Sequence, residues 1–189
     1  HRPAPKALAV YRKALGVRDC WWFLFFYSVS FGGFLGLAST RPGYFHDQYG
    51  FDAVTAGYYT AACVFAGSLM RPLGGALADR IGGIRSLLVM YSIASLSIFA
   101  VGFKLDSAVA ALGLFVVAML CLGAGNGAVF QLVPQRFRKE IGVMTGLIGM
   151  AGGIGGFLLA AGLGAVKQST GDYQMGLWLF ASLGIVAWI

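Results

Sequence analysis

Arg71 lies inside a long apolar stretch, and the next acidic residue toward the C-terminus is Asp79. A charged side chain near the middle of a membrane costs at least about 2.5 to 3.5 kcal/mol on insertion scales, so a compensating group is expected. A guanidinium donates two parallel hydrogen bonds to a planar oxyanion, which suits nitrate, nitrite or a carboxylate. We expect Arg71 to face an aqueous cavity and bind such an anion. The alternative is that it extends to the lipid headgroups or donates to backbone carbonyls of a neighbouring helix.

The other charged residues fall between the apolar stretches or at their edges. Thirteen of the fourteen basic residues are placed there, Arg41 among them, together with all seven acidic residues. Arg71 therefore has no predicted carboxylate partner, and no carboxylate is available inside these stretches to carry a proton. Pro72, directly after Arg71, predicts a bend in the helix, which fits an ordinary kink and a gate equally well.

Aromatic and amide side chains supply further candidates. Tyr27 and Phe31 are four residues apart and so share one face of a helix, where a tyrosine hydroxyl needs a partner. In the stretch LGAGNGAVFQLVP, Asn126 and Gln131 are the uncharged polar groups. Hydrogen bonding across helices is the favoured role for either amide, and direct contact with a ligand is the second.

A glycine-rich segment repeats at helical spacing. Glycines recur at intervals of 4, 3, 4 and 3 residues, on one face of one helix: Gly142, Gly146, Gly149, Gly153 and Gly156. Gly152 and Gly155 widen this bare strip, and small residues let a helix or a ligand approach the backbone. We expect most of the row to serve helix packing, and the dense part from Gly152 to Gly156 to slide or to line a narrow path.

The elements that position these residues must be buried in lipid. Of the 189 residues, 58% are hydrophobic and 11% are charged, with a mean hydropathy of +0.77. A soluble domain of this length needs a charged shell that these residues cannot form. The net charge of +7 belongs to residues that flank the apolar stretches, which indicates membrane topology and no binding of nucleic acid.

The same composition argues against an enzyme. Cys20, Cys63 and Cys121 stand singly and are interpreted as small buried apolar residues, so no metal site is expected. His1 and His46 lie outside the predicted spans, and no nucleophile and base can be paired. No phosphate-binding loop for ATP is present, so transport would have to be driven by an ion or substrate gradient, with no cofactor.

Six apolar stretches are long enough to predict membrane spans, at about 20 residues for 30 Å of hydrocarbon. They cover residues 20–40, 55–78, 84–103, 108–134, 141–166 and 174–189, the last one cut short by the end of the sequence. Charged and turn-forming segments separate them, beginning with RPGYFHDQYGFD. No initiating methionine or cleavable signal peptide is visible in the sequence, so we expect it to be a segment of a longer protein.

Lysine and arginine are unevenly distributed between the two sides of these spans. Ten lie in the N-terminal flank and in the loops after the second and fourth spans, and three lie in the alternate loops. Because cytoplasmic flanks are enriched in Lys and Arg, the first span is predicted to begin in the cytoplasm.

Several segments together resemble a known family. RPLGGALADRIGGIR resembles the GxLaDRxGrr loop motif of the major facilitator superfamily. FGGFLGLAS, YFHDQYG, GSLMRPLGG, GNGAVFQLVPQRF and GLIGMAGGIGGF together resemble the C-terminal half of its nitrate/nitrite porters of the NarK and NasA type. The resemblance covers nearly the whole chain.

The resemblance implies an all-α membrane protein whose six transmembrane helices form one half, helices 7 to 12, of a twelve-helix fold. Residues 1–19 would be a cytoplasmic basic linker between the halves, and residues 20–189 the C-terminal half with its last helix truncated. Arg71 would be the anion-binding arginine of this half, with Tyr27 and Phe31 facing the substrate. The remaining matches would be the glycine signature of the eleventh helix and the loop motif that latches helices together: Gly152, Gly153, Gly155, Gly156, Asp79, Arg80 and Arg85.

The implied activity is secondary transport of nitrate or nitrite across the bacterial inner membrane, by proton symport or by exchange of the two anions. The implied partners are the anion, the lipid bilayer and the N-terminal six-helix half. Arg71 and Asn126 are the polar candidates for contact with the anion, beside Gly152 and Gly153. Two other functions stay open: transport of a small carboxylate such as oxalate or formate, and a membrane scaffold without transport. A scaffold has no need for an unpaired cation inside the membrane.

Overall fold

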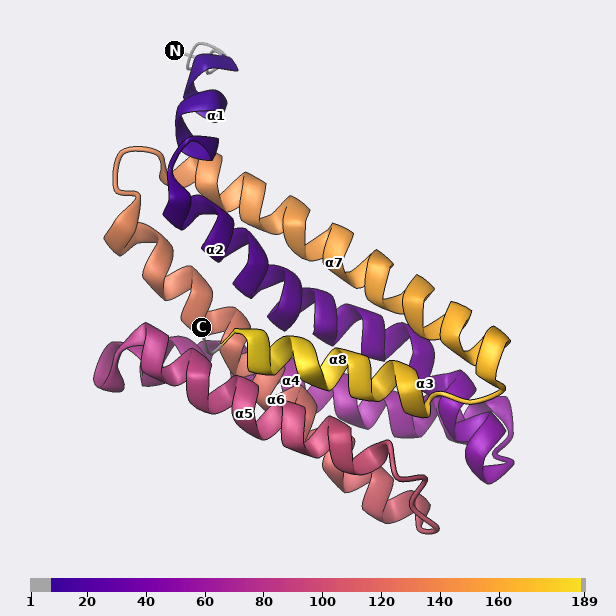
Figure 1. The fold of residues 1–189 in the computed structure, drawn as a ribbon. Coiled ribbons are helices and arrows are strands. Elements are labelled where there is room, and N and C mark those ends of the chain that lie inside the picture. Colours follow the sequence, from indigo (N-terminus) through magenta and orange to yellow (C-terminus); the bar gives the residue numbers. More distant parts are fainter. Residues whose placement is uncertain (1–7, 188–189) are drawn as a thin grey trace.

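Helices account for most of the chain in the computed structural model, which describes residues 8–187 (Figure 1). The elements are α1 (Leu8–Leu15), α2 (Arg18–Tyr27), a π-helical turn η1 (Ser28–Gly32), α3 (Gly33–Tyr49), α4 (Ala53–Ile81), α5 (Gly83–Val101), α6 (Ala108–Arg136), α7 (Ile141–Thr170) and α8 (Gln174–Val186). His1, Arg2 and Lys6 of the predicted linker lie outside the described residues, as do the last two residues of the sixth predicted span.

Five stretches are long and apolar enough to cross a membrane. They are Arg18–Tyr49, which joins α2, η1 and α3, and the single helices α4, α5, α6 and α7. The all-α membrane architecture is therefore confirmed. The sixth predicted span forms α8, an apolar helix of 13 residues that is shorter than the other five over its described part.

The predicted end of the first span, at residue 40, is wrong. The segment RPGYFHDQYG was expected to form a loop, but α3 continues through Arg41, Pro42 and Gly43 to Tyr49. Proline and charge mark loops in soluble chains, whereas helices in membranes tolerate proline when neighbouring groups accommodate the lost hydrogen bond. Arg71 is consequently not the only basic residue well inside a span, because Arg41 lies inside one too.

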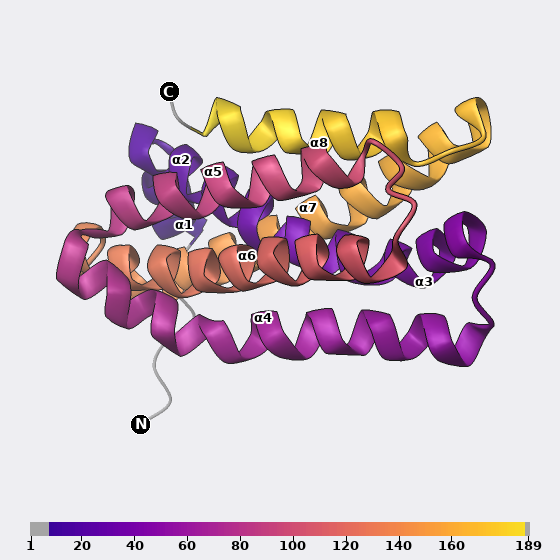
Figure 2. The same cartoon turned by 90° about the horizontal axis from the view of Figure 1, so that it is seen from below.

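The helices pack in a sequence that differs from their order in the chain. In Figure 2, α4, α6, α5 and α8 follow one another from one edge of the bundle to the other, while α7 lies beside the α2–η1–α3 helix (Figure 1). The closest pair is α4 with α6, whose backbones meet at glycines. A Cβ atom on Gly74 would lie 2.4 Å from the Ala124 Cα, and one on Gly123 would lie 1.9 Å from the Gly67 carbonyl oxygen.

The connections between the helices gather at two opposite ends of the bundle, the Asp79 end and the Lys104 end. The Asp79 end holds the α4–α5 turn, the α6–α7 loop and the start of α2. The α4–α5 turn needs glycine, because Gly82 has φ of +93°, a region that L-residues rarely adopt. The Lys104 end holds the other three connections: α3–α4, α5–α6 and α7–α8.

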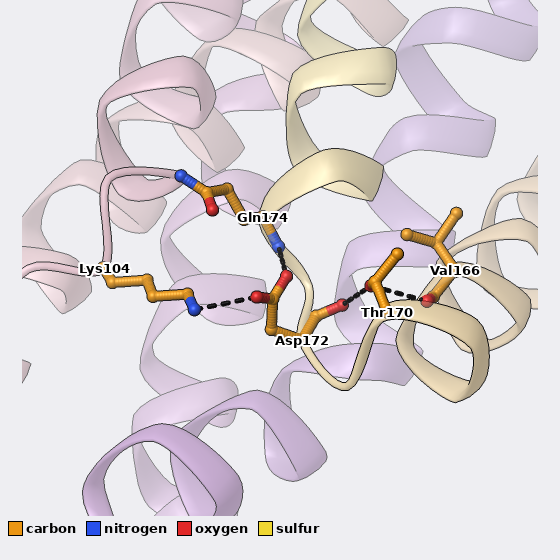
Figure 3. A network of polar contacts seen from close by, with 5 residues as sticks. All are labelled: Lys104, Val166, Thr170, Asp172 and Gln174. Atoms are coloured by element: carbon orange, nitrogen blue, oxygen red, sulfur yellow. Dashed lines mark hydrogen bonds and ion pairs between the residues drawn. The ribbon is translucent and has the colours of Figure 1, made fainter.

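Ion pairs tie loops together at the Lys104 end. Lys104 Nζ lies 2.7 Å from Asp172 Oδ2, and Asp172 Oδ1 accepts the Gln174 amide at 3.0 Å (Figure 3). Hydrogen bonding with Lys104 lowers the pKa of Asp172 below its usual range. The Thr170 hydroxyl donates to the carbonyl oxygens of Val166 and Asp172, so the α7–α8 turn is held in place on both sides.

Further ion pairs link helices at both ends. Lys167 pairs with Asp47, which connects α7 to α3 at the Lys104 end. Arg136 pairs with Asp19, which connects α6 to α2 at the Asp79 end. Also near the Lys104 end, Asp52 caps α4 by accepting the amides of Val54 and Thr55, and hydrogen bonding with Thr55 lowers its pKa.

Candidate functional site

The guanidinium of Arg71 lies between two aromatic rings of the α2–η1–α3 helix. Its Cζ is 5.4 Å from the ring centroid of Phe31 and 4.9 Å from that of Phe34, within the range of cation–π attraction. Arg71 is the nineteenth of the 29 residues of α4, about 15 Å along the helix axis from Ile81 and about 27 Å from Ala53. The charge therefore lies well inside the bundle.

Arg71 has no carboxylate partner among the described residues. Within the same residues its side chain makes no hydrogen bond to a carbonyl, and its Nε is buried without an acceptor. The side chain as a whole is only half-buried. The terminal guanidinium nitrogens therefore keep donors available, while the Cζ atom lies over two aromatic rings.

Tyr27 and Phe31 lie side by side, as their spacing predicts. Their rings stack with centroids 5.2 Å apart and planes 6° apart, and the edge of the Phe130 ring meets Tyr27 at 4.9 Å. Tyr27 is 7% exposed, and its phenol group interacts electrostatically with Arg71. A cation, a tyrosine hydroxyl and three aromatic rings thus come together from α4, α6 and the α2–η1–α3 helix.

The π-helical turn η1 places these rings against α7. Ser28, its first residue, donates from its hydroxyl to the Ala151 carbonyl oxygen at 2.9 Å. Gly32, its last residue, lies so close to α7 that a Cβ atom there would be 2.8 Å from the Gly155 carbonyl carbon. Single π-helical turns within α-helices are frequent at functional sites.

Of the three glycines of α7 that pack closely against the α2–η1–α3 helix, only Gly156 belongs to the predicted row. A Cβ atom on Gly152 would meet the Tyr27 ring at 2.6 Å, one on Gly155 the backbone of Ser28 at 2.8 Å, and one on Gly156 the Leu35 side chain at 2.9 Å. In contrast, four glycines of the row are exposed, and three of them have no described neighbour within 4 Å of an added Cβ: Gly146, Gly149 and Gly153. The packing face of α7 therefore shares Gly156 with the regular glycine repeat and otherwise runs beside it, through Gly152 and Gly155.

The two amides behave differently. Gln131 donates from Nε2 to Asp79 Oδ1 at 2.7 Å, which is a hydrogen bond across helices of the predicted kind. Asn126 is 3% exposed, and neither its amide nitrogen nor its oxygen has a hydrogen-bond partner among residues 8–187. The cross-helix role is therefore not seen for Asn126, whose polar atoms stay unused beside the tight α4–α6 contact.

The loop motif lies apart from the aromatic cluster. Asp79 is eight residues beyond Arg71, about 12 Å along α4, and Arg80 and Arg85 are exposed at the same end of the bundle. The structure thus joins Arg71, Tyr27, Phe31 and Gly152 in one place, and leaves the motif residues together at the Asp79 end.

Sequence reasoning missed three residues of interest. Phe34 follows Tyr27 and Phe31 at the i, i+4, i+7 spacing of one helix face, so this pattern was available in the sequence. Phe130 stands in a segment that was noted for its amides only. Arg41 was placed in a loop because it precedes proline and glycine.

Comparison with known proteins gives consistent matches. The chain is 32% identical over 181 residues to the "Nitrite extrusion protein" of Bacillus subtilis, covering 96% of this chain and 45% of that protein. It is 35% identical over 169 residues to the "Probable nitrate/nitrite transporter NarK2" of Mycobacterium tuberculosis, covering 88% of this chain and 43% of that one. It is 30% identical over 163 residues to the "Probable nitrate transporter NarT" of Staphylococcus haemolyticus, covering 86% and 42%.

The chain therefore spans less than half the length of these curated relatives. In addition, residues 1–160 match the family model of the Major Facilitator Superfamily.

Proposed function

The chain belongs to the Major Facilitator Superfamily, and from that premise we propose that it is half of a secondary transporter for nitrate or nitrite. The observation that carries the proposal is Arg71, a half-buried cation with no described carboxylate partner, held between the rings of Phe31 and Phe34. The relatives named as nitrate or nitrite transporters support the choice of anion. The anion undergoes no chemical reaction in this proposal.

Each neighbour of Arg71 has a physical role in binding. The planar guanidinium donates two parallel hydrogen bonds to two oxygens of the anion. The aromatic rings exclude water, which strengthens the attraction between the guanidinium and the anion. The Tyr27 hydroxyl adds a neutral donor, and Gly152 leaves room for the Tyr27 ring against α7. Asn126 and Gly153 remain proposed contacts, since Asn126 has unused polar atoms and Gly153 lies on an open face.

The chain would form helices 7 to 12, and its missing partner would be an N-terminal half of six helices. Residues 1–19 would link the halves, and their described part already contains α1 and the start of α2. The bare glycines on the open face of α7 offer the partner half a close approach. Transport would follow from rocking of the halves around the anion, coupled to protons or to exchange of nitrate for nitrite.

The orientation in this proposal follows from the basic residues. The Asp79 end carries most of them and would face the cytoplasm, where basic residues are enriched. Since Arg41 lies inside α3, Lys104 and Lys167 are the only lysine or arginine residues at the Lys104 end among residues 8–187, so the asymmetry is larger than the sequence predicted. Asp79, Arg80 and Arg85 would latch helices together in one access state. Gly155 and Gly156 would hold α7 against the α2–η1–α3 helix.

Uptake of labelled nitrate tests the function. The full-length transporter that contains this chain is expressed in cells without nitrate uptake of their own, as wild type, Arg71→Ala and Arg71→Lys. We expect both variants to lose uptake while membrane abundance stays normal, because lysine keeps the charge but not the two-pronged hydrogen bonding. Arg138→Lys, a change at an exposed arginine of the α6–α7 loop, is the matched control and should transport normally.

Two results would contradict the proposal. Full uptake by the Arg71→Ala variant would remove Arg71 from the binding site. If the wild type takes up neither nitrate nor nitrite but takes up labelled formate or oxalate, the substrate is a carboxylate and not nitrate or nitrite.

A further inference from the structure

Arg41 is the most deeply buried cation of the described chain. Its side chain is 1% exposed, and none of its three guanidinium nitrogens makes a hydrogen bond to a described oxygen acceptor. The guanidinium lies over the Phe115 ring, with Cζ 5.1 Å from the centroid, and close enough to the Cys63 thiol to interact with it electrostatically. A thiol is only a weak acceptor, so the strong donors of Arg41 are left without a matching group.

No carboxylate neutralises this charge within residues 8–187. The acidic residue nearest to Arg41 in the sequence, Asp47, pairs with Lys167 instead. An unpaired charge in a protein interior is strongly unfavourable, because water no longer solvates it. A group that carries negative charge and accepts hydrogen bonds would remove this cost.

Arg41 and Arg71 lie along the same contact between helices. Arg41 comes seven residues after Phe34 on the α2–η1–α3 helix, and Cys63 comes eight residues before Arg71 on α4. Both separations are about two helical turns, or about 11 Å. Between them, Phe34 packs against Gly67, where an added Cβ would lie 2.6 Å from the ring. The α3–α4 contact therefore carries a cation at each of two levels, with the packed Phe34 and Gly67 between them.

We propose that Arg41, with Cys63 and Phe115, forms a second binding site for a small monovalent oxyanion of the kind that Arg71 binds. The proposal rests on the proposed function, since it assigns the same anion class to a position nearer the Lys104 end. Arg41 would supply the paired donors, the thiol of Cys63 a weaker one, and the Phe115 ring would hold the guanidinium plane. Because the guanidinium nitrogens are fully covered, the anion enters when α3 moves away from α4.

The number of anions bound by the purified full-length transporter tests this site. Equilibrium dialysis with labelled nitrate is applied to wild type, Arg41→Met, Arg71→Ala and the surface control Arg138→Met. We expect two nitrates per wild-type molecule and per Arg138→Met molecule, and one in each of the other two variants. Melting temperature without nitrate should not fall in Arg41→Met, because methionine removes an unpaired buried charge and keeps an apolar chain. If Arg41 had only a structural role, its replacement by methionine would instead lower the melting temperature.

The outcomes separate the two proposals. If the wild type binds one nitrate, and Arg41→Met still binds it while Arg71→Ala does not, the second site is rejected and the proposed function stands. No nitrate bound to the wild type contradicts the proposed function itself. If Arg41→Met does not fold, Arg41→Lys decides: the second site should weaken about tenfold with the first unchanged, since lysine cannot donate in parallel. Equal binding at both sites in Arg41→Lys would reject the inference.

Discussion

Arg71 lies over two aromatic rings at a place inside a span where a charged partner would be expected. Attraction to the rings of Phe31 and Phe34 stabilises the positive charge without using its N–H groups. A carboxylate in the same place would occupy the donors and compete with an anion for them. Two phenylalanines therefore lie against the cation and leave its hydrogen-bond donors free, as the proposed anion site requires.

Removing only the hydroxyl of Tyr27 should weaken anion binding. In Tyr27→Phe the stacking on Phe31 and the edge contact with Phe130 remain, so the melting temperature should not change. A hydrogen bond to a charged group contributes about 1.5 to 3 kcal/mol, so the Kd for nitrate should rise about tenfold or more. Tyr58→Phe, at an exposed tyrosine of α4, serves as the control. An unchanged Kd in Tyr27→Phe would exclude its hydroxyl from the site.

For single residues, the sequence predicted which side chains would be important better than it predicted what those side chains contact. The unpaired Arg71 and the Tyr27–Phe31 pair were recognisable, because apolar context and i, i+4 spacing are local properties. Arg41 was not, since its burial depends on Phe115 and Cys63 from two other helices. The unused amide of Asn126 also results from the tertiary packing of α6 against α4.

Among the elements, α7 uses its glycines in two different ways. Gly152, Gly155 and Gly156 bring its backbone close to the α2–η1–α3 helix, whereas Gly146, Gly149 and Gly153 lie on an open face. The regular 4-3-4-3 spacing suggested a single packing strip, and periodicity alone cannot tell which strip meets a neighbour. Span positions were predicted well for α4 to α7, because apolar length is a strong signal.

Adding one methyl group to α7 should separate the two faces. In Gly155→Ala the new Cβ would lie 2.8 Å from the Ser28 carbonyl oxygen, so the helices must shift. Overpacking of this kind costs about 1 to 3 kcal/mol, and we expect a lower melting temperature in detergent. Gly153→Ala adds a methyl with no described neighbour within 4 Å and should unfold at the wild-type temperature or slightly above, since alanine favours helix.

Nitrate uptake in the same two variants tests what the open face does. If Gly153 lines the passage or contacts the partner half, uptake by Gly153→Ala falls although stability does not. Equal loss of stability in both variants would show that Gly153 is packed in the full-length protein as Gly155 is here.

On the scale of the whole molecule, the two ends of the bundle differ in charge. Ion pairs lie at both ends, Lys104–Asp172 and Lys167–Asp47 at one and Arg136–Asp19 and Lys13–Glu140 at the other, but the Asp79 end gathers most of the basic residues. Large apolar side chains such as Phe65 of α4 and Phe157 of α7 remain exposed between the ends, as expected for surfaces that face lipid or the partner half.

Cysteine labelling in intact cells should reveal which end faces out. The native cysteines Cys20, Cys63 and Cys121 are buried, at 0%, 0% and 8% exposure. A cysteine introduced on the surface of this chain should therefore react with a thiol reagent above a low background. Ser169→Cys, at the Lys104 end, should react with a membrane-impermeant maleimide on whole cells. Arg138→Cys, at the Asp79 end, should react only after the cells are opened. The reverse pattern would invert the proposed orientation.

The π-helical turn Ser28–Gly32 also sets the direction in which the rest of its helix faces. Such a turn contains one residue more than a regular α-helical path, so the extra residue is absorbed locally. If the same five residues instead adopted a regular α-helix, every residue after them would be rotated by about 100° relative to α2. Phe34 and Arg41 would then leave the contact with α4 together, although neither had been altered. A local change from π-helical to α-helical winding would thus separate Phe34 from Arg71 and Arg41 from Cys63 at once.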